Sequence, residues 1–225
     1  APPRFGKTTF ISSWAHKNEH PGAWVSLDDA DNDPALFWSY VVSSLRSAIS
    51  NIDPDFLNQI ELSKLPPTKT ILAYLINALV ECGTPISLIL DDYHLISNPQ
   101  IHKDLTYLIE NQPPPLHVVL ITRADPPLPI ARLRGNGQLI EVRAADLRFS
   151  NDETAVFMNE MMQLGLADRD IAALDKRTEG WAIGLQLAAI SMQKCEDKSK
   201  FVTDFSGSHY FVLEYLIEEV IEQLP

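Results

Sequence analysis

Near the middle of the chain stands the run Ile86-Ser87-Leu88-Ile89-Leu90-Asp91-Asp92, a short apolar segment that ends in two aspartates. Its apolar residues do not alternate with polar ones, which is typical of a parallel strand buried on both faces. In open α/β sheets the ligand crevice lies outside the carboxyl ends of the strands. The run therefore predicts an α/β fold and places a candidate site at Asp91 and Asp92.

The segments around this run alternate between helical and extended patterns, as expected for a parallel sheet sandwiched by helices. Asp33 is the expected N-cap of a helix whose first residue is Pro34. Further strands are expected at 23–27, 117–122 and 139–142, and further helices after Lys7, over 71–79 and from Asn98-Pro99.

The pattern changes near residue 147, where the extended segments stop. Ser150 followed by Glu153 predicts a capping box, and the remaining patterns are helical, at about 151–163, 168–176, 179–193 and 208–223. We expect an α/β core over 1–146 and a small all-helical subdomain over 147–225. The chain opens at Ala1 inside a motif, so we interpret it as a fragment that lacks the first strand of the core.

The first residues form a candidate phosphate loop. A P-loop needs a tight turn whose amides point at phosphate oxygens, followed at once by a helix N-terminus. Its lysine neutralises the β- and γ-phosphates and its hydroxyl residue coordinates Mg²⁺. Gly6-Lys7-Thr8 has the required order, although Ala1 stands where the first glycine of the motif is usual. The motif alone is weak, and an ordinary solvated helix start remains the alternative.

Three polar residues at the ends of two strands complete the candidate site. Asp91 can hold Mg²⁺ and Asp92 can orient the attacking water, whereas a solvated strand end or a helix cap is the alternative for this pair. Arg123 follows the strand expected at 117–122 and can sense the charge of a γ-phosphate. A surface salt bridge is the alternative for Arg123.

The bulk composition excludes several classes of protein. The formal net charge of −12 speaks against direct nucleic-acid binding by this segment, because such proteins carry a basic face. Cys82 and Cys195 are too few for a disulfide framework or a metal site. No apolar run approaches the roughly 18 residues of a membrane span and no signal peptide is present, so we expect a cytoplasmic protein that does not contact the membrane.

Several segments together resemble a known family. They are Pro2–Thr9, Trp24–Pro34, Leu90–Ile96, Thr122–Pro129, Ala144–Phe149 and Thr178–Ala189. In these segments the chain resembles the nucleotide-binding module of MalT-type regulators, which are large ATP-binding LuxR-family transcriptional activators of the STAND class of P-loop ATPases. The resemblance covers nearly the whole chain.

The resemblance implies a regulatory switch. ADP would hold a resting monomer, ATP with an inducer would favour a self-associating form, and slow hydrolysis would reset it. DNA would be bound only through a C-terminal helix-turn-helix that lies outside this chain. The implied nucleotide-binding residues are Phe5, Gly6, Lys7, Thr8 and Thr9; the implied Mg²⁺ ligands are Thr8 and Asp91; and the implied catalytic residues are Lys7, Asp92 and Arg123.

Two departures from the family leave alternatives open. Arg4 stands where the family usually has glycine, which either adds a cation to the phosphates or impairs the loop. Gln186 stands where related families carry a proline that contacts the nucleotide base. The second hypothesis is therefore a nucleotide-binding scaffold that does not hydrolyse ATP. A third, an origin-binding type of ATPase, requires a sensor arginine on the lid, for which Arg177 is the nearby candidate.

The acidic segment Asp28–Asp33 is a further candidate, either for helix caps or for a metal site. Asp, Asn, Ser and Thr favour N-cap positions because their side chains accept hydrogen bonds from exposed backbone amides. We therefore expect caps in this segment.

Overall fold

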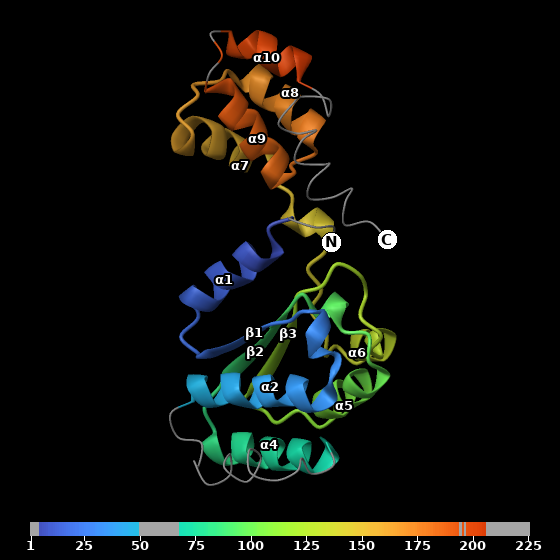
Figure 1. Cartoon of the computed structure of the whole chain (residues 1–225). Coiled ribbons are helices and arrows are strands. Elements are labelled where there is room, and N and C mark those ends of the chain that lie inside the picture. Colours follow the sequence, from blue (N-terminus) through green and yellow to red (C-terminus); the bar gives the residue numbers. More distant parts are fainter. Residues whose placement is uncertain (1–4, 50–67, 194, 196, 206–225) are drawn as a thin grey trace. The chain divides into compact units, whose positions relative to one another are not determined.

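The computed structural model describes residues 5–49, 68–193, 195 and 197–205 of the chain. The chain forms two compact units, drawn in Figure 1. We call Thr8–Glu141 the α/β unit, and Ala1–Lys7 together with Val142–Pro225 the helical unit. The predicted domain division between residues 146 and 147 stays a prediction.

The α/β unit contains three strands, which are β1 (Gly22–Ser26), β2 (Ile86–Asp91) and β3 (Leu116–Leu120). Its helices are α1 (Lys7–Lys17, which begins one residue before the unit), α2 (Pro34–Ala48), α4 (Thr68–Cys82), α5 (Pro99–Glu110) and α6 (Ile130–Gly135). Two short 3-10 segments, η1 (Asp29–Asn32) and η2 (Tyr93–Leu95), follow β1 and β2.

The strands form a parallel sheet in the order β1-β2-β3. In this register Leu90 of the central strand lies between Val25 and Leu120. All six residues of β2 are buried, which explains why its sequence lacks alternation. The predicted fold class, a parallel α/β sheet flanked by helices with a helical subdomain, is confirmed.

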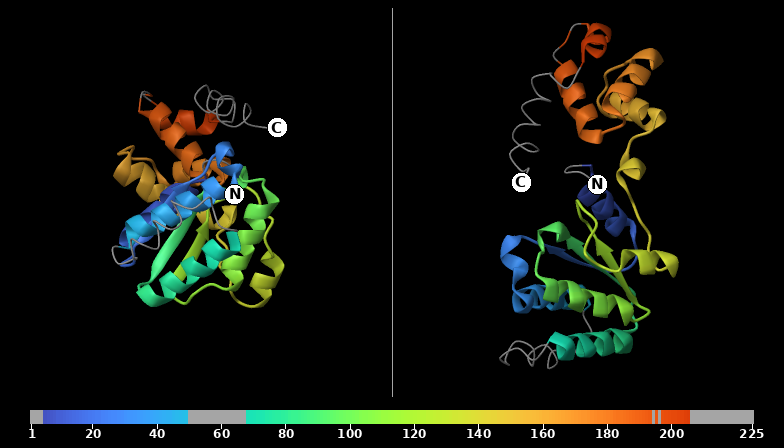
Figure 2. Two further views of the ribbon diagram at one scale, coloured as in Figure 1. Left: turned by 60° about the horizontal axis from the view of Figure 1, so that its bottom comes forward. Right: turned by 90° about the vertical axis from the view of Figure 1, so that its right-hand side faces the viewer.

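The two faces of β2 have different surroundings. Ile86, Leu88 and Leu90 join a core with the buried faces of α2, α4 and α5, and Figure 2 shows these helices on the same side of the strands. Because side chains alternate along a strand, the intervening Ser87, Ile89 and Asp91 belong to the opposite face. Asp91 therefore points away from the helical layer.

Side-chain caps fix where two helices of this layer begin. The Asp33 carboxylate accepts hydrogen bonds from the amides of Ala35 and Leu36, at 2.8 and 3.0 Å. The Asn98 side chain caps α5 through the Gln100 amide at 2.8 Å. Pro34 and Pro99 follow as the first helical residues, where a missing N–H costs nothing. Both predicted helix starts are confirmed.

The helical unit contains η3 (Ala144–Leu147), α7 (Asn151–Ala155), η4 (Val156–Met161), α8 (Asp168–Thr178), α9 (Ala182–Met192) and α10 (Lys198–Asp204). The predicted capping box is present: the Ser150 hydroxyl accepts from the Glu153 amide, and the Glu153 carboxylate accepts from the Ser150 amide. A second core, which includes Met158, Leu174 and Leu185, holds this unit together.

Two sequence predictions need correction. The strand expected at 139–142 is an irregular segment in which Ile140 is 93% exposed, so the segment lacks the burial that stabilises a strand. The helix expected at 151–163 is α-helical only to Ala155 and continues as the π-helix η4. The Asn159 side chain bonds both backbone groups of Leu166, and the chain turns there.

The remaining helix predictions agree with α1, α2, α4, α5, α8 and α9, apart from small shifts at their ends. The helix expected at 208–223 lies outside the described residues. Among the described residues, no helix is both long enough and apolar enough to cross a membrane. The short helices α6 and α10 were not anticipated from the sequence.

Candidate functional site

The phosphate-loop segment has the backbone that its sequence predicts. Gly6 adopts a φ of +73°, a left-handed conformation that side-chain-bearing residues rarely adopt. Helix α1 begins directly afterwards at Lys7, so the amides at its N-terminus belong to Lys7, Thr8 and Thr9. This arrangement of a left-handed glycine and a helix N-terminus suits an anion. Arg4 lies outside the described residues.

Thr8 and Asp91 lie together although 83 positions separate them in the sequence. The Thr8 hydroxyl donates a hydrogen bond to Oδ1 of Asp91 at 3.3 Å. Asp91 is only 5% exposed and its Oδ1 also accepts from the Asp92 amide at 3.0 Å. The two side chains are therefore close enough to share one ion, and their role as Mg²⁺ ligands stays a prediction.

Asp92 follows the strand in a strained conformation. It has a φ of +55° and a ψ of +35°, which is the left-handed region that non-glycine residues seldom occupy. Its side chain is 48% exposed, and Nδ1 of His94 lies 3.7 Å from its Oδ1. The carboxylate of Asp92 is thus half exposed, whereas that of Asp91 is buried. This difference agrees with the hypothesis that Asp92 orients a water molecule and Asp91 binds a metal ion.

Arg123 lies at the same edge of the sheet. Leu90 pairs with Leu120, so Asp91 and the segment after β3 emerge side by side at the carboxyl ends of their strands. The turn that contains Arg123 is closed by the Thr122 hydroxyl, which donates to the Ala124 carbonyl at 2.7 Å. The Arg123 side chain is exposed. Its role as a γ-phosphate sensor stays a prediction.

The acidic segment at the end of β1 serves as a set of caps. Asp28 accepts from the Ala30 amide at 2.7 Å, while Asp31 accepts from the Asp28 amide at 2.8 Å. Asn32 is the residue that the sequence did not single out: its Oδ1 accepts from the amides of Ser97 and Asn98. Asn32 thereby ties the turn after β1 to the segment that leads into α5.

In the helical unit, two glycines explain the motif that begins at Thr178. A Cβ on Gly180 would lie 2.3 Å from the Phe149 carbonyl oxygen, and φ there is +68°. A Cβ on Gly184 would lie 2.8 Å from the Trp181 ring. Trp181 also faces Phe5, with ring centroids 6.2 Å apart. The start of α9 is therefore closely packed, while Gln186 on the same helix is exposed.

Arg177, the lid arginine considered for the third hypothesis, donates to the carbonyl of Phe205 within the helical unit. This contact joins α8 to the end of α10. It gives Arg177 a structural partner in its own unit.

A buried polar pair stands next to the Asp91-Asp92 turn. The hydroxyl of Tyr93 and Nδ1 of His102 are 2.7 Å apart, and the two residues are 1% and 8% exposed. Burial raises the pKa of the Tyr93 phenol and lowers the pKa of the His102 imidazole. Neither residue was assigned a role from the sequence, because a tyrosine and a histidine nine positions apart form no recognisable motif.

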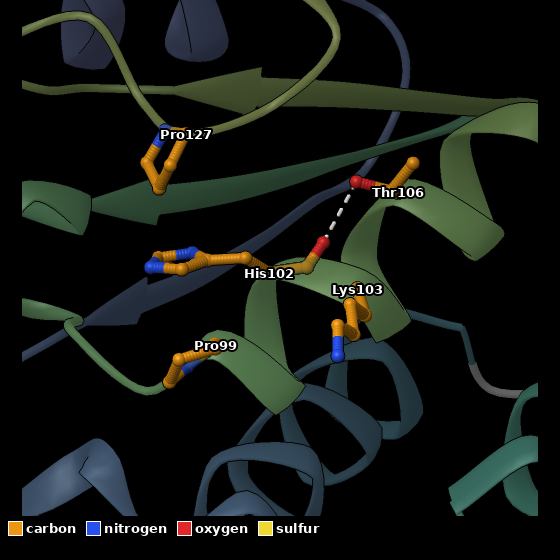
Figure 3. A pocket seen from close by; sticks show the side chains of 5 residues that line it. All are labelled: Pro99, His102, Lys103, Thr106 and Pro127. Carbon is orange, nitrogen blue, oxygen red and sulfur yellow. Dashed lines mark hydrogen bonds between the residues drawn. The ribbon is translucent and has the colours of Figure 1, made fainter.

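His102 also borders an open hollow of about 350 Å³. Figure 3 shows the imidazole between Pro99, at the start of α5, and Pro127, in the segment after β3. Lys103 and Thr106 complete the lining, and the Thr106 hydroxyl donates to the His102 carbonyl at 2.7 Å. The hollow lies beside the Tyr93 pair, and it does not include Thr8 or Asp91.

The residues at the end of β2 fit a magnesium ion that arrives with phosphate. Mg²⁺ prefers oxygen ligands and is often held by one or two carboxylates together with substrate phosphates. The Thr8 hydroxyl and the Asp91 carboxylate supply such oxygens at one point. Within the described part of the chain no group of three or more His, Cys, Asp or Glu side chains could hold an ion, and a site shared with phosphates does not need one.

Similarity to known proteins extends over the whole chain. The HTH-type transcriptional regulator MalT of Yersinia enterocolitica is 32% identical over 227 residues, and that of Serratia proteamaculans is 32% identical over 229, each match covering 99% of this chain. MalT of Klebsiella pneumoniae is 30% identical over 228 residues and 100% of this chain. The chain is homologous to a segment of the MalT-type regulators. The resemblance inferred from the sequence is confirmed.

The chain spans about a quarter of the length of these curated relatives, 25% in each case. No protein-family model matches the chain.

Proposed function

We propose that this chain is the ATP-binding and slowly hydrolysing switch module of a MalT-like transcriptional regulator. The observation that carries the proposal is the hydrogen bond from Thr8 to Asp91, which joins the phosphate-loop helix to the end of the central strand. Similarity to regulators named as HTH-type supports the assignment to transcription control. In this proposal ADP stabilises the resting state, and ATP with an inducer favours self-association.

Each candidate residue has one task in the proposed reaction. The amides of Phe5 to Thr9 and the Lys7 ammonium bind the phosphates, and Thr8 and Asp91 hold Mg²⁺. When bound, the ion would neutralise developing charge on the phosphate oxygens. Asp92, whose carboxylate is half exposed, accepts a hydrogen bond from the attacking water and orients it. Arg123 stabilises charge on the transferred phosphoryl group.

Binding of DNA is assigned to a helix-turn-helix outside this chain. The relatives are HTH-type transcriptional regulators, and the chain matches only a quarter of their length. The net charge of −12 agrees with a module that does not itself contact DNA phosphates.

The test is nucleotide binding and single-turnover hydrolysis by the purified chain. A fluorescent ATP analogue and its ADP counterpart are titrated with and without Mg²⁺, and phosphate release is followed with the enzyme in excess. We expect Lys7→Ala to weaken ATP binding at least about tenfold, because it removes the cation at the phosphates. Lys17→Ala, in the exposed last turn of the same helix, is the control and should bind normally.

Asp92→Asn separates hydrolysis from binding. We expect it to bind ATP like the wild-type chain and to release phosphate at least about tenfold more slowly, because an amide is a poor acceptor for the proton of water. Tight Mg²⁺-dependent binding without phosphate release by the wild-type chain would favour the non-hydrolysing scaffold. No binding at all would end the nucleotide hypothesis.

A further inference from the structure

The turn that carries Asp92 is held by backbone hydrogen bonds and by the buried side chain of Tyr93. Asp92 itself is in the left-handed conformation and its side chain is half exposed. Its neighbour Tyr93 is buried and accepts from the Ile96 amide at 3.1 Å, while the Tyr93 amide donates to the Ile121 carbonyl at 3.0 Å. The direction in which Asp92 points therefore depends on how firmly Tyr93 is fixed.

The far end of Tyr93 is fixed by α5. Its hydroxyl and Nδ1 of His102 are 2.7 Å apart, and the two rings meet edge to face with centroids 5.6 Å apart. His102 lies in the second turn of a helix whose start is capped by Asn98, and Asn98 is in turn bonded to Asn32. The imidazole thus belongs to a helix whose start is tied to the turn after β1.

The direction of the hydrogen bond follows from the partners available to each group. The side chains of Tyr93 and His102 are both buried, at 1% and 8% exposed. A buried hydroxyl that donates to nothing costs about 1–3 kcal/mol, and the described bond of the Tyr93 hydroxyl is the one to His102. Tyr93 therefore donates to Nδ1, and His102 carries its proton on Nε2.

The same histidine also neighbours the segment that follows Arg123. The hollow at His102 is lined by Pro127, four positions after Arg123, and by Pro99 of α5 (Figure 3). Tyr93 reaches the end of β3 through its amide, which donates to the Ile121 carbonyl. The pair thus borders both the segment that carries Asp92 and the segment that carries Arg123.

We propose that Tyr93 and His102 are positioning residues, which hold the turn after β2 so that the Asp92 carboxylate faces the attacking water. This inference rests on the proposed function and adds two residues to it. Neither side chain contacts the nucleotide in this proposal. Their effect is carried by the geometry of the Asp92 backbone, since a displacement of about 1 Å at a reacting group can cost up to about 100-fold in rate.

The test uses Tyr93→Phe, which removes the donor and keeps the ring, and His102→Leu, which removes the acceptor. We expect the rate of single-turnover phosphate release to fall about tenfold in each, while the dissociation constants for ATP and Mg²⁺ stay within about twofold. The double variant should be no slower than either single variant, because both break the same bond. His102→Asn, whose side-chain oxygen can take the place of Nδ1, should regain most of the rate.

The matched control is Tyr107→Phe, at a tyrosine of α5 that is partly buried against the same core. Its phosphate release should equal that of the wild-type chain. All rates are measured at least about 15 °C below the melting temperature of each variant, so that loss of folded protein does not lower them. If His102→Leu does not fold, Tyr93→Phe and His102→Asn still decide the question.

The outcomes distinguish this inference from the proposed function. Wild-type hydrolysis together with an unchanged rate in Tyr93→Phe overturns the positioning role alone. A lower melting temperature with an unchanged rate of phosphate release also overturns the positioning role, because the pair would then contribute only to stability. A wild-type chain that binds ATP and never releases phosphate overturns both the hydrolytic step and this inference.

Discussion

Acidic residues stand at or just after the ends of two neighbouring strands, and the two groups make different hydrogen bonds. At the end of β1, Asp28, Asp31 and Asp33 accept hydrogen bonds from amides within three positions of themselves. At the end of β2, Asp91 accepts from the hydroxyl of Thr8, 83 positions away. The register pairs Ser26 with Asp91, so both groups emerge at the same edge of one sheet.

The difference shows what an acidic cluster can mean. Carboxylates occupied by nearby amides begin helices, and each contributes about 0.5–2 kcal/mol to stability. Asp31 is as buried as Asp91, each at 5% exposed, so the feature that distinguishes Asp91 is its bond to the hydroxyl of Thr8, a second oxygen group from a distant helix start. Asp91 is therefore a stronger candidate for binding a cation, and changes at the two strand ends should affect different measurements.

The largest effect is expected for Asp91→Asn. Replacing a metal-binding carboxylate by a neutral amide should lower Mg²⁺-dependent phosphate release about 100-fold or more. The amide oxygen can still accept from the Asp92 backbone, so the melting temperature should change little. Asp29→Asn, an exposed aspartate at the end of β1, is the control in the same hydrolysis assay. An equal loss of phosphate release in the two variants would mean that the acidic residues at the two strand ends do not differ in function.

Thr8→Ala should have the next largest effect. Loss of one oxygen ligand should raise the Mg²⁺ concentration needed for half-maximal ATP binding about tenfold, because water must replace the hydroxyl. Ser13→Ala, an exposed hydroxyl on the same helix, should leave that concentration unchanged. A Thr8→Ala chain with normal Mg²⁺ dependence would show that the bond to Asp91 is structural.

Asp33→Ala tests the other strand end. It removes the carboxylate that caps α2 through two amides, which should cost about 1 kcal/mol of unfolding free energy and lower the melting temperature by about 2–4 °C. Nucleotide binding should be unaffected. Thermal unfolding of Asp29→Ala, whose side chain is not the N-cap of α2, is the control. An equal loss of unfolding free energy in both variants would mean that the loss does not come from the cap.

The smallest effect is expected at a cap in the helical unit. The backbone amide and hydroxyl of Ser150 hold the pKa of Glu153 below its ordinary value. A lowered pKa in the folded state gives stability above the ordinary pKa of a glutamate and loses it as the pH falls through the lowered pKa. Because Glu153 is exposed, we expect only a few tenths of a kcal/mol.

Thermal unfolding of Glu153→Gln between pH 7 and pH 3 measures this contribution. The difference in melting temperature from the wild-type chain should shrink as the pH falls. A difference that is constant across this range would mean that the charge of Glu153 does not act through the cap.

Local signals in the sequence identified the capped helices and the buried strands. Asp33-Pro34, Asn98-Pro99 and the Ser150–Glu153 box each contain the chemistry of their own helix start within four residues. The same local reasoning failed at 139–142, where a short apolar run finds no burial, and at 156–161, where the bonds of Asn159 accompany a π-helix. It gave no role to Tyr93 or His102, whose contact depends on how η2 meets α5.

The sequence by itself determined the parallel α/β class, the position of the turn at Gly6 and the relation to MalT-type regulators, because periodicity, turn glycines and shared motifs depend on residues that are close together in the chain. Only the tertiary structure decided that Asp91 meets Thr8 and that Tyr93 meets His102. These contacts depend on the register of parallel strands and on the packing of helices between them, and these bring together residues that the chain keeps far apart.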